Sequence, residues 1–130
     1  MYSPSEEIYD FIFAQVKKKY PVFDHPPQKN ETVTYPYVVI DDTQSIMTGY
    51  KDATGLRTTL TLHVWGKVNQ RKQVTRIVDD LRRLGMKGVR TNHYAWQGRP
   101  NEQEQQLLTD TSVPNTVLKH GYLTLVFDLK

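Results

Sequence analysis

The chain has 130 residues, a hydrophobic share of 38%, a formal net charge of +3 and no cysteine. This length suits one domain with one core, so we expect a single domain over residues 1–130. The lack of cysteine excludes disulfide scaffolds, thiol nucleophiles and thiolate zinc sites. No segment approaches the ~20 apolar residues of a membrane span, and the polar, acidic start from Met1 to Glu7 is unlike a signal peptide.

The first predicted element is a helix that begins at Pro4 and ends before Tyr20. Ser3 is a suitable N-cap, and Glu6 completes the S-x-x-E pattern of a capping box. Pro21 disfavours helical geometry at the preceding residue and so ends the helix. The apolar side chains at helical spacing, which should lie on the core, are Ile8, Phe11, Ile12 and Val16.

The next segments are predicted as a short extended piece, a strand and a connection. Residues 21–32 are rich in proline and form the extended piece plus a loop. Residues 33–41 form a strand whose apolar centre suits coverage on both faces. Pro36 marks the entry of this strand or an edge position, because proline cannot donate to a central ladder. The polar residues 42–55 are predicted as a turn or an extended hairpin connection.

Two segments in the middle of the chain have the clearest patterns. Residues 56–65 alternate and predict a strand. One face carries Leu56, Thr58, Leu60, Leu62 and Val64, and the other carries Arg57, Thr59, Thr61, His63 and Trp65. Residues 70–84 predict a helix, with Asn69 as N-cap and Gly85 as a left-handed C-cap. The apolar stripe of this helix consists of Val74, Ile77, Val78, Leu81 and Leu84.

The last third of the chain is predicted as an extended segment, a loop and a closing strand. Residues 86–96 are predicted to be extended, and residues 119–130 alternate as a strand. The polar residues 97–116 predict a mobile loop, in which Pro100 could open a short helix. The order of elements indicates an α+β fold: a mostly antiparallel or mixed β-sheet with two α-helices packed on one face.

Positive charge is concentrated around the second predicted helix. Residues 67–90 hold eight basic residues and two acids, a local sum of +6, whereas residues 1–66 sum to −2 and residues 91–130 to −1. This distribution suits head-to-tail contact between copies and also suits a polyanion. Trp65, Tyr94 and Trp96 are near in sequence, so nucleic-acid binding is one interpretation. No recognised binding motif is present, which favours a solvated or interfacial helix face.

The titratable residues do not form a pattern typical of an enzyme or a metal site. Asp41 and Asp42 are neighbours at a strand end, where side chains point to opposite faces, so we predict a turn or cap role rather than a shared dyad. No G-x-S-x-G elbow, P-loop or G-x-G-x-x-G fingerprint occurs. The histidines, none of which has the spacing of a helical metal pair, are His25, His63, His93 and His120. We therefore predict no enzyme, no metal and no cofactor.

Four segments of the chain form a recognisable series. They are residues 35–40 with Pro-Tyr-Val at their centre, the strand 60–65 that ends in tryptophan, the helix pattern Arg71-x-x-Val74-x-x-Ile77-x-x-x-Leu81-x-x-Leu84 and the closing strand 121–127. In this order they resemble the tail-completion (tail-terminator) proteins of long-tailed bacteriophages. The polar segment 97–116 is long for this family.

The resemblance implies a structural virion protein with a role in tail assembly. Members are small α/β proteins, several of which form hexameric rings at the head-proximal end of the tail tube, stop tube polymerisation and join the filled head. The implied partners are copies of the same chain, the major tail tube protein and a head-completion or connector protein. Assembly would take place in the host cytoplasm, and genomic DNA would pass through the ring without sequence-specific contact.

A ring needs two different patches on each subunit that meet under rotation. We predict that the basic helix supplies one patch and acidic residues the other, and that the edge of the proline-containing strand pairs with a neighbour. The residues predicted for these contacts are Arg71, Arg76, Arg82, Arg83, Asp41, Asp42, Asp52 and Pro36. Two alternatives remain, namely another neck protein (head-completion or adaptor) or a nucleic-acid-binding module.

Overall fold

The computed structural model describes residues 2–28, 31–48 and 55–130. Its helices and strands are α1 (Pro4–Lys17), β1 (Val22–Phe23), β2 (Tyr37–Met47), β3 (Leu56–Lys67), α2 (Arg71–Arg82), β4 (Gly88–Arg90), β5 (Ala95–Gly98), β6 (Gln105–Asp110) and β7 (Leu118–Leu129). Short 3₁₀ turns span Val68–Gln70, Arg83–Gly85 and Pro100–Glu102. Among these described residues, no helix is long and apolar enough to cross a membrane.

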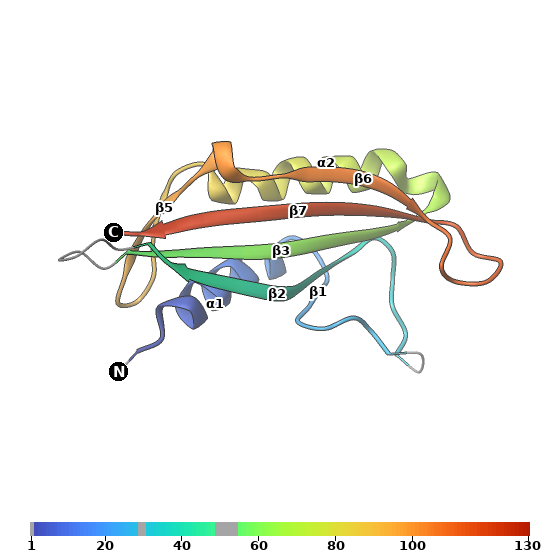
Figure 1. Cartoon of the computed structure of the whole chain (residues 1–130). Helices are drawn as coiled ribbons and strands as arrows, with labels where there is room; N and C mark the ends of the chain where they lie inside the picture. Colours follow the sequence, from blue (N-terminus) through green and yellow to red (C-terminus); the bar gives the residue numbers. More distant parts are fainter. Residues whose placement is uncertain (1, 29–30, 49–54) are drawn as a thin grey trace.

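The strands form one mixed sheet in the order β1-β2-β3-β7-β5-β4, and β6 also pairs with β7. Within the described residues β1 and β2 are parallel, and the other paired strands are antiparallel. β3 lies along one edge of β7 over its whole length, whereas β6 and β5 share the other edge (Figure 1). This arrangement confirms the predicted α+β fold with a mixed, mostly antiparallel sheet.

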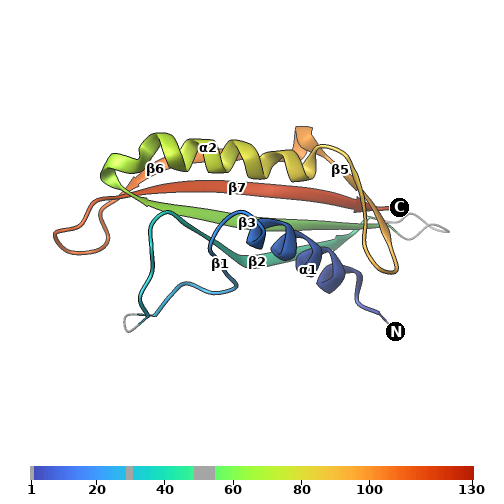
Figure 2. The ribbon, with the colours of Figure 1, turned by 180° about the vertical axis from the view of Figure 1, so that it is seen from behind.

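Both helices pack on the same face of the sheet, as predicted. The inward side chains of β3 are Leu60, Leu62 and Val64, all with no exposed area. They join a core to which α1 contributes through Ile8, Ile12 and Val16 and α2 through Val74, Ile77, Val78 and Leu81. Figure 2 shows α1 and α2 in front of the same side of the long strands. The apolar stripes of the two helices therefore explain their placement, since burial of those side chains drives the packing.

Two glycines let α2 lie close to the sheet. A Cβ atom added at Gly121 of β7 would lie 2.6 Å from Val78 Cγ2 and 3.0 Å from Val74 Cγ1. At Gly66 of β3 it would lie 2.5 Å from Val74 Cγ2. A side chain at either position would push the helix outward, because core atoms are already at packing distance.

The ends of α1 agree with the sequence-based prediction. Ser3 is its N-cap, and the Ser3 hydroxyl accepts a hydrogen bond of 3.3 Å from the Glu6 backbone N–H. The hydroxyl of Tyr9 donates to the backbone carbonyl of Ile40 over 2.5 Å, which fastens the helix to β2. Burial is the main cause that raises the pKa of Tyr9 to about 12, so this hydroxyl keeps its proton and remains a donor.

Two predicted loops contain strands. The segment 42–55 was predicted as a connection, yet β2 continues to Met47, whose partner is Leu56 at the start of β3. Within the predicted loop 97–116, β6 pairs with residues 118–123 of β7. Both segments are exposed on both faces, so they lack the apolar alternation that marks a half-buried strand. Pairing with a regular neighbour, rather than their own pattern, makes them strands.

Three smaller predictions at element ends are wrong. The first predicted strand begins at Tyr37 rather than at residue 33, directly after the cis bond between Tyr35 and Pro36. Asn69 lies within the 3₁₀ turn, and Gln70 is the N-cap of α2. Gly85 is not left-handed, because no described glycine has a positive φ. Its role is close approach, since the backbone of Gly85 lies against Gly98.

Candidate functional site

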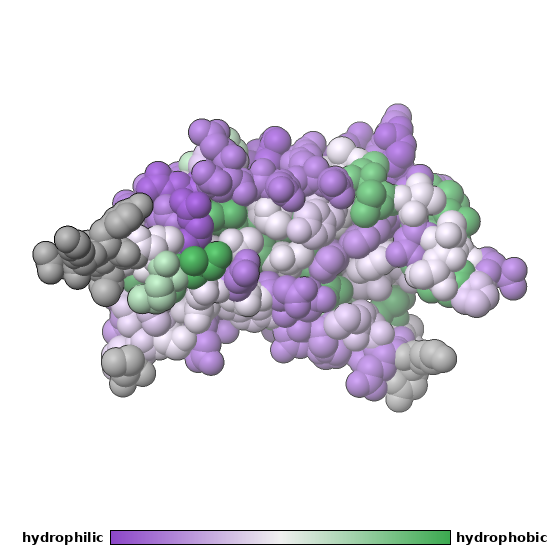
Figure 3. All heavy atoms as spheres, in the orientation of Figure 1, coloured by the Kyte–Doolittle hydropathy of each residue, from purple (hydrophilic) through white to green (hydrophobic). Residues whose placement is uncertain are grey.

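The face of the sheet turned away from the helices, here called the open face, carries aromatic and titratable side chains. Figures 1 and 3 view the molecule from this side. The alternation of β3 places Arg57, His63 and Trp65 on it, as predicted. The antiparallel register sets Tyr122 opposite His63 and His120 opposite Trp65. Residues far apart in sequence are thereby gathered into one row.

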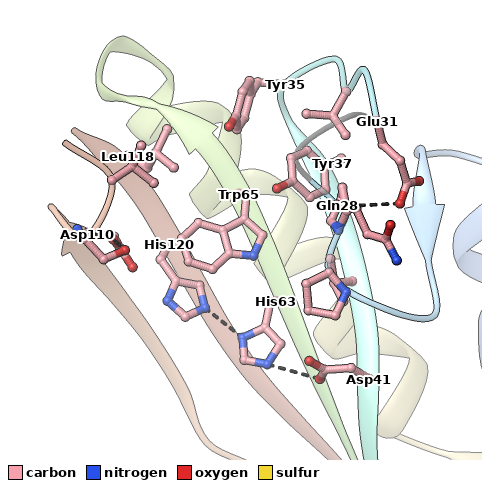
Figure 4. A pocket seen from close by; sticks show the side chains of 16 residues that line it. Gln28, Glu31, Tyr35, Tyr37, Asp41, His63, Trp65, Asp110, Leu118 and His120 are labelled. Atoms are coloured by element: carbon pink, nitrogen blue, oxygen red, sulfur yellow. Dashed lines mark hydrogen bonds and ion pairs between the residues drawn. The ribbon is translucent and has the colours of Figure 1, made fainter. Parts of the chain in front are cut away.

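A pocket of about 540 Å³ opens on this face. β2, β3 and β7 form its floor, and the segment before β2 and the turn between β6 and β7 form its walls. This volume lies within the roughly 300–1,000 Å³ of pockets that hold small ligands. The lining residues that matter below are Tyr35, Tyr37, Asp41, His63, Trp65 and His120 (Figure 4).

Two histidines and an aspartate form a chain across the pocket floor. His63 Nδ1 lies 2.7 Å from His120 Nε2, and His63 Nε2 lies 3.3 Å from Asp41 Oδ1 (Figure 4). The second contact is within ion-pair distance but is not a hydrogen bond, because the buried Oδ1 has no hydrogen-bond partner among the described protein atoms. The carboxylate of Asp41, 25% exposed, therefore has unused capacity to accept hydrogen bonds.

The short contact between the two imidazoles restricts their protonation. At 2.7 Å one nitrogen donates a hydrogen bond and the other accepts it, so only one of the two rings carries an N–H group at this contact. Burial and the neighbouring His63 lower the pKa of His120 below its ordinary value. The indole of Trp65 stacks on His120 with 4.0 Å between ring centroids and 6° between planes. The floor of the pocket is thus flat and aromatic, and burial disfavours the charged form of His120.

A β-bulge brings Asp41 to this site and overturns one prediction. In the register of β2 with β3, Ile40 pairs with Leu62 and Asp42 pairs with Thr61, so Asp41 is an extra residue between them. Asp41 lines the pocket on the open face, and Asp42 lies opposite Thr61 on the same face. The two aspartates therefore do not point to opposite faces as regular alternation had predicted.

The described residues of the site form neither a metal cluster of three ligands nor a hydrogen bond between a serine and an imidazole. Within the described residues no three His, Asp or Glu side chains are placed to hold a metal ion. Ser112 also lines the pocket, but its hydroxyl is bonded to Asp110 Oδ1 over 2.5 Å rather than to an imidazole. An acidic residue and aromatic walls instead favour recognition of a cation.

The outer face of α2 is the second candidate surface, and it is basic. Its four predicted arginines, Arg71, Arg76, Arg82 and Arg83, are all exposed. The acids of the helix have intramolecular partners: Asp79 accepts from Gln105 over 3.2 Å, and Asp80 accepts from Tyr20 over 2.6 Å. The Tyr20 hydrogen bond is the main cause of the lowered pKa of Asp80. Hydrophilic side chains cover the edge of the molecule that holds α2 (Figure 3).

The structure places the predicted contact residues on opposite sides of the sheet. The arginines lie on the helix side, and Asp41 and Asp42 lie on the open face, so one chain does not bring the two sets together. Pro36 is half-buried at the entry of β2. Asp52 lies outside the described residues. The free edge of β2 is residues 42–47 rather than the Pro36 end, because β1 pairs with Val38 and Val39.

The aromatic residues considered for nucleic-acid binding do not join the basic helix. Trp65 lies on the open face, and Trp96 is buried with no exposed area. The hydroxyl of Tyr94 donates to the backbone carbonyl of Tyr2 over 2.7 Å, near the start of α1. Among the residues that the structure describes, a surface that combines cations with base-stacking rings is therefore not formed around α2.

Sequence reasoning missed the histidine pair, although one signal was available. His63 was assigned to the outward face of its strand, and the same alternation in residues 119–130 sets His120 opposite the leucine face. Two outward histidines on adjacent strands meet only in the right register. That register depends on pairing over a separation of 57 residues, which local patterns do not contain.

Comparison with known proteins identifies the class first: the chain is a structural protein of a bacteriophage tail. A family model described as "Tail completion protein gp17" matches residues 14–84, and the chain belongs to this family. The resemblance seen in the sequence is thereby confirmed.

The fold is also found in a solved virion structure. The matching chain belongs to a structure titled "Virion of native gene transfer agent (GTA) particle", with a TM-score of 0.61 and 10% sequence identity over 98% of this chain and 94% of that one. No curated protein sequence matches. At this identity the structural match establishes a shared fold, and the family match establishes the class.

Proposed function

We propose that this protein caps the head-proximal end of the phage tail tube and forms the tail-side surface to which the filled head joins. Membership of the tail-completion family supports an assembly role. The proposed partners are copies of the same chain, the major tail tube protein and a head-completion or connector protein. Genomic DNA passes through the assembled cap without sequence-specific contact.

The observation that carries this proposal is the separation of opposite charges onto the two sides of the sheet. A basic helix face on one side and an acidic, aromatic face on the other cannot satisfy each other within one chain. Two such patches form a heterologous interface, which closes into a ring when successive subunits are related by rotation. The proposed ring is a hexamer. Its contacts involve Arg71, Arg76, Arg82 and Arg83 on one subunit and Asp41 and Asp42 on the next.

Charge reversal on α2 tests this function. Phage that carry Arg82→Glu and Arg83→Glu are expected to produce unjoined heads and tubes of abnormal length, because the reversed charges repel the neighbouring acidic face. Electron microscopy of the lysate measures both defects. A matched control is Lys17→Glu with Lys18→Glu, two exposed lysines at the end of α1 outside the proposed contacts.

The outcomes separate the proposal from its nearest alternative. Normal tails joined to normal heads in the Arg82→Glu, Arg83→Glu phage would contradict the assigned contacts. Fractionation of separated heads and tails then tests the position of the protein. Recovery with heads rather than tails would favour a head-completion or adaptor protein of the neck.

A further inference from the structure

The pocket on the open face contains carboxylate groups that have few hydrogen-bond partners within the described part of the chain. The carboxylate of Asp41 faces the pocket and accepts no hydrogen bond from the described residues. A second carboxylate in the pocket lining, that of Asp110, accepts hydrogen bonds only from Ser112 among the described residues. Glu31, also in the lining, is within ion-pair distance of His25. The lowered pKa of His120 adds no positive charge to offset these acids. Three carboxylates therefore line a pocket that has no lysine or arginine among its described lining residues.

The walls of the pocket add a preference for a flat cation. Trp65 and His120 form a stacked pair, and Tyr35 and Tyr37 stand beside them with ring centroids 5.3 Å apart. A guanidinium group stacks on aromatic faces and donates to a carboxylate in the same plane, which an ammonium group cannot do. An arginine side chain thus fits both the charge and the shape of this pocket better than a lysine.

We propose that this pocket receives Arg76 from α2 of a second copy of the chain. The inference rests on the proposed ring and specifies its contact. Arg76 lies near the middle of the exposed side of α2, away from the buried stripe of Val74, Ile77, Val78 and Leu81. It has no ion-pair partner in the described part of the chain. Because the pocket and α2 lie on opposite sides of one sheet, the contact is head-to-tail and repeats from copy to copy.

Cysteine cross-linking between copies tests the contact directly, because the chain has no cysteine of its own. One variant carries Lys72→Cys, one helical turn from Arg76, and the other carries Val113→Cys in the pocket lining. A short bis-maleimide added to a mixture is expected to give a mixed dimer. The control replaces Val113→Cys by Asn101→Cys, an exposed position near Asp128 at the other end of β7. Both mixtures are tested as free protein and in assembled tails.

Substitution of the two charged groups then tests the chemistry. In the cross-linking mixture, Asp41→Asn is expected to reduce the yield at least about tenfold, because loss of one partner leaves the other charge buried and unpaired. Arg76→Lys is expected to retain part of the yield, and the exposed neighbour Asp42→Asn to retain more of it than Asp41→Asn. Circular dichroism of each variant excludes a loss of folding as the cause.

The results distinguish this contact from the proposed function. A Lys72–Val113 cross-link that depends on Asp41 supports the inference. Cross-linking of Val113→Cys to the tube protein, or tails that contain the protein without a Lys72–Val113 cross-link, would overturn the contact and leave the capping role standing. Tails that lack the protein would overturn the capping role itself.

Discussion

The two faces of the central sheet come from the same strands but differ in what covers them. On β3, Leu62 faces the two helices and has no exposed area, whereas the next residue, His63, faces the pocket. The helix face is closed by apolar packing within the chain. The open face keeps charged and aromatic groups at its surface. We infer that the chain gains its stability from one face and reserves the other for contacts with partners.

The largest expected effect comes from a substitution on the closed face. Leu62→Ala should lower the free energy of unfolding by about 2–5 kcal/mol, because it removes buried methyl groups and leaves a cavity. Urea denaturation measures the change. Thr61→Ala, the neighbour on the open face, should cost less than about 1 kcal/mol. Equal losses in the free energy of unfolding at the two positions would contradict the proposed division of roles between the two faces.

The second prediction concerns the tight contact between α2 and the sheet. Gly121→Ala places a methyl group 2.6 Å from Val78 Cγ2, which forces the helix to move. We expect a loss of about 1–3 kcal/mol from overpacking. Val78→Ala in the same chain provides space and should recover part of the loss, although each substitution alone destabilises. Additive losses in the double-mutant cycle would show that the two groups do not touch.

The closed face could be predicted well from the sequence because its signals are local. The apolar stripe of residues 74–84 and the alternation of residues 56–65 each identify an element and its buried side without knowledge of the rest of the chain. The strand β3 and the helix α2 were found in this way. The second half of β2 and all of β6 were missed, since their side chains are exposed on both faces and only pairing makes them strands.

The open face was predicted only in part, because its pocket depends on register. On the other side of the sheet, the basic character of α2 could be read from composition, and the exposure of its arginines agrees with that prediction. The meeting of Asp41 with His63 requires a β-bulge, and that of His63 with His120 requires pairing of distant strands. Neither the β-bulge nor the pairing of distant strands can be recognised from the local sequence pattern. The predicted contacts between copies stay predictions until they are tested.

The third prediction uses an ion-pair cluster at the other end of the open face. Asp128 accepts a 2.7 Å hydrogen bond from Arg57 and another of 2.7 Å from Arg99, and these bonds hold the pKa of its carboxyl below the usual value of 3.8. Asp128→Asn should cost about 1–2 kcal/mol at pH 7, since hydrogen bonds to a charged group are stronger than neutral ones.

The pH dependence of that cost provides its control. A lowered folded-state pKa means that the unfolded chain binds more protons, so this stabilisation is complete above pH 3.8 and is lost as the pH falls through the folded pKa. The difference between wild type and Asp128→Asn, measured by urea denaturation, should therefore shrink as the pH falls below 3.8. A difference that stays constant as the pH falls further would contradict the cluster.

The smallest expected effect is the titration of His120 in the pocket. Burial, followed by the charge of His63, lowers its pKa below the ordinary 6.5, while Asp110 and Asp41 act in the opposite direction. Because the folded state binds this proton less readily, the group's contribution to stability is complete above pH 6.5 and is lost as the pH falls towards the folded pKa.

NMR titration of the imidazole Cε1–H signal of His120 should give a pKa below 6.5. His63→Gln should move that value upward, since it removes a neighbouring positive charge and leaves burial largely unchanged. A His120 pKa at or above 6.5 in the wild type would contradict burial and the charge of His63 as the dominant influences on this ring.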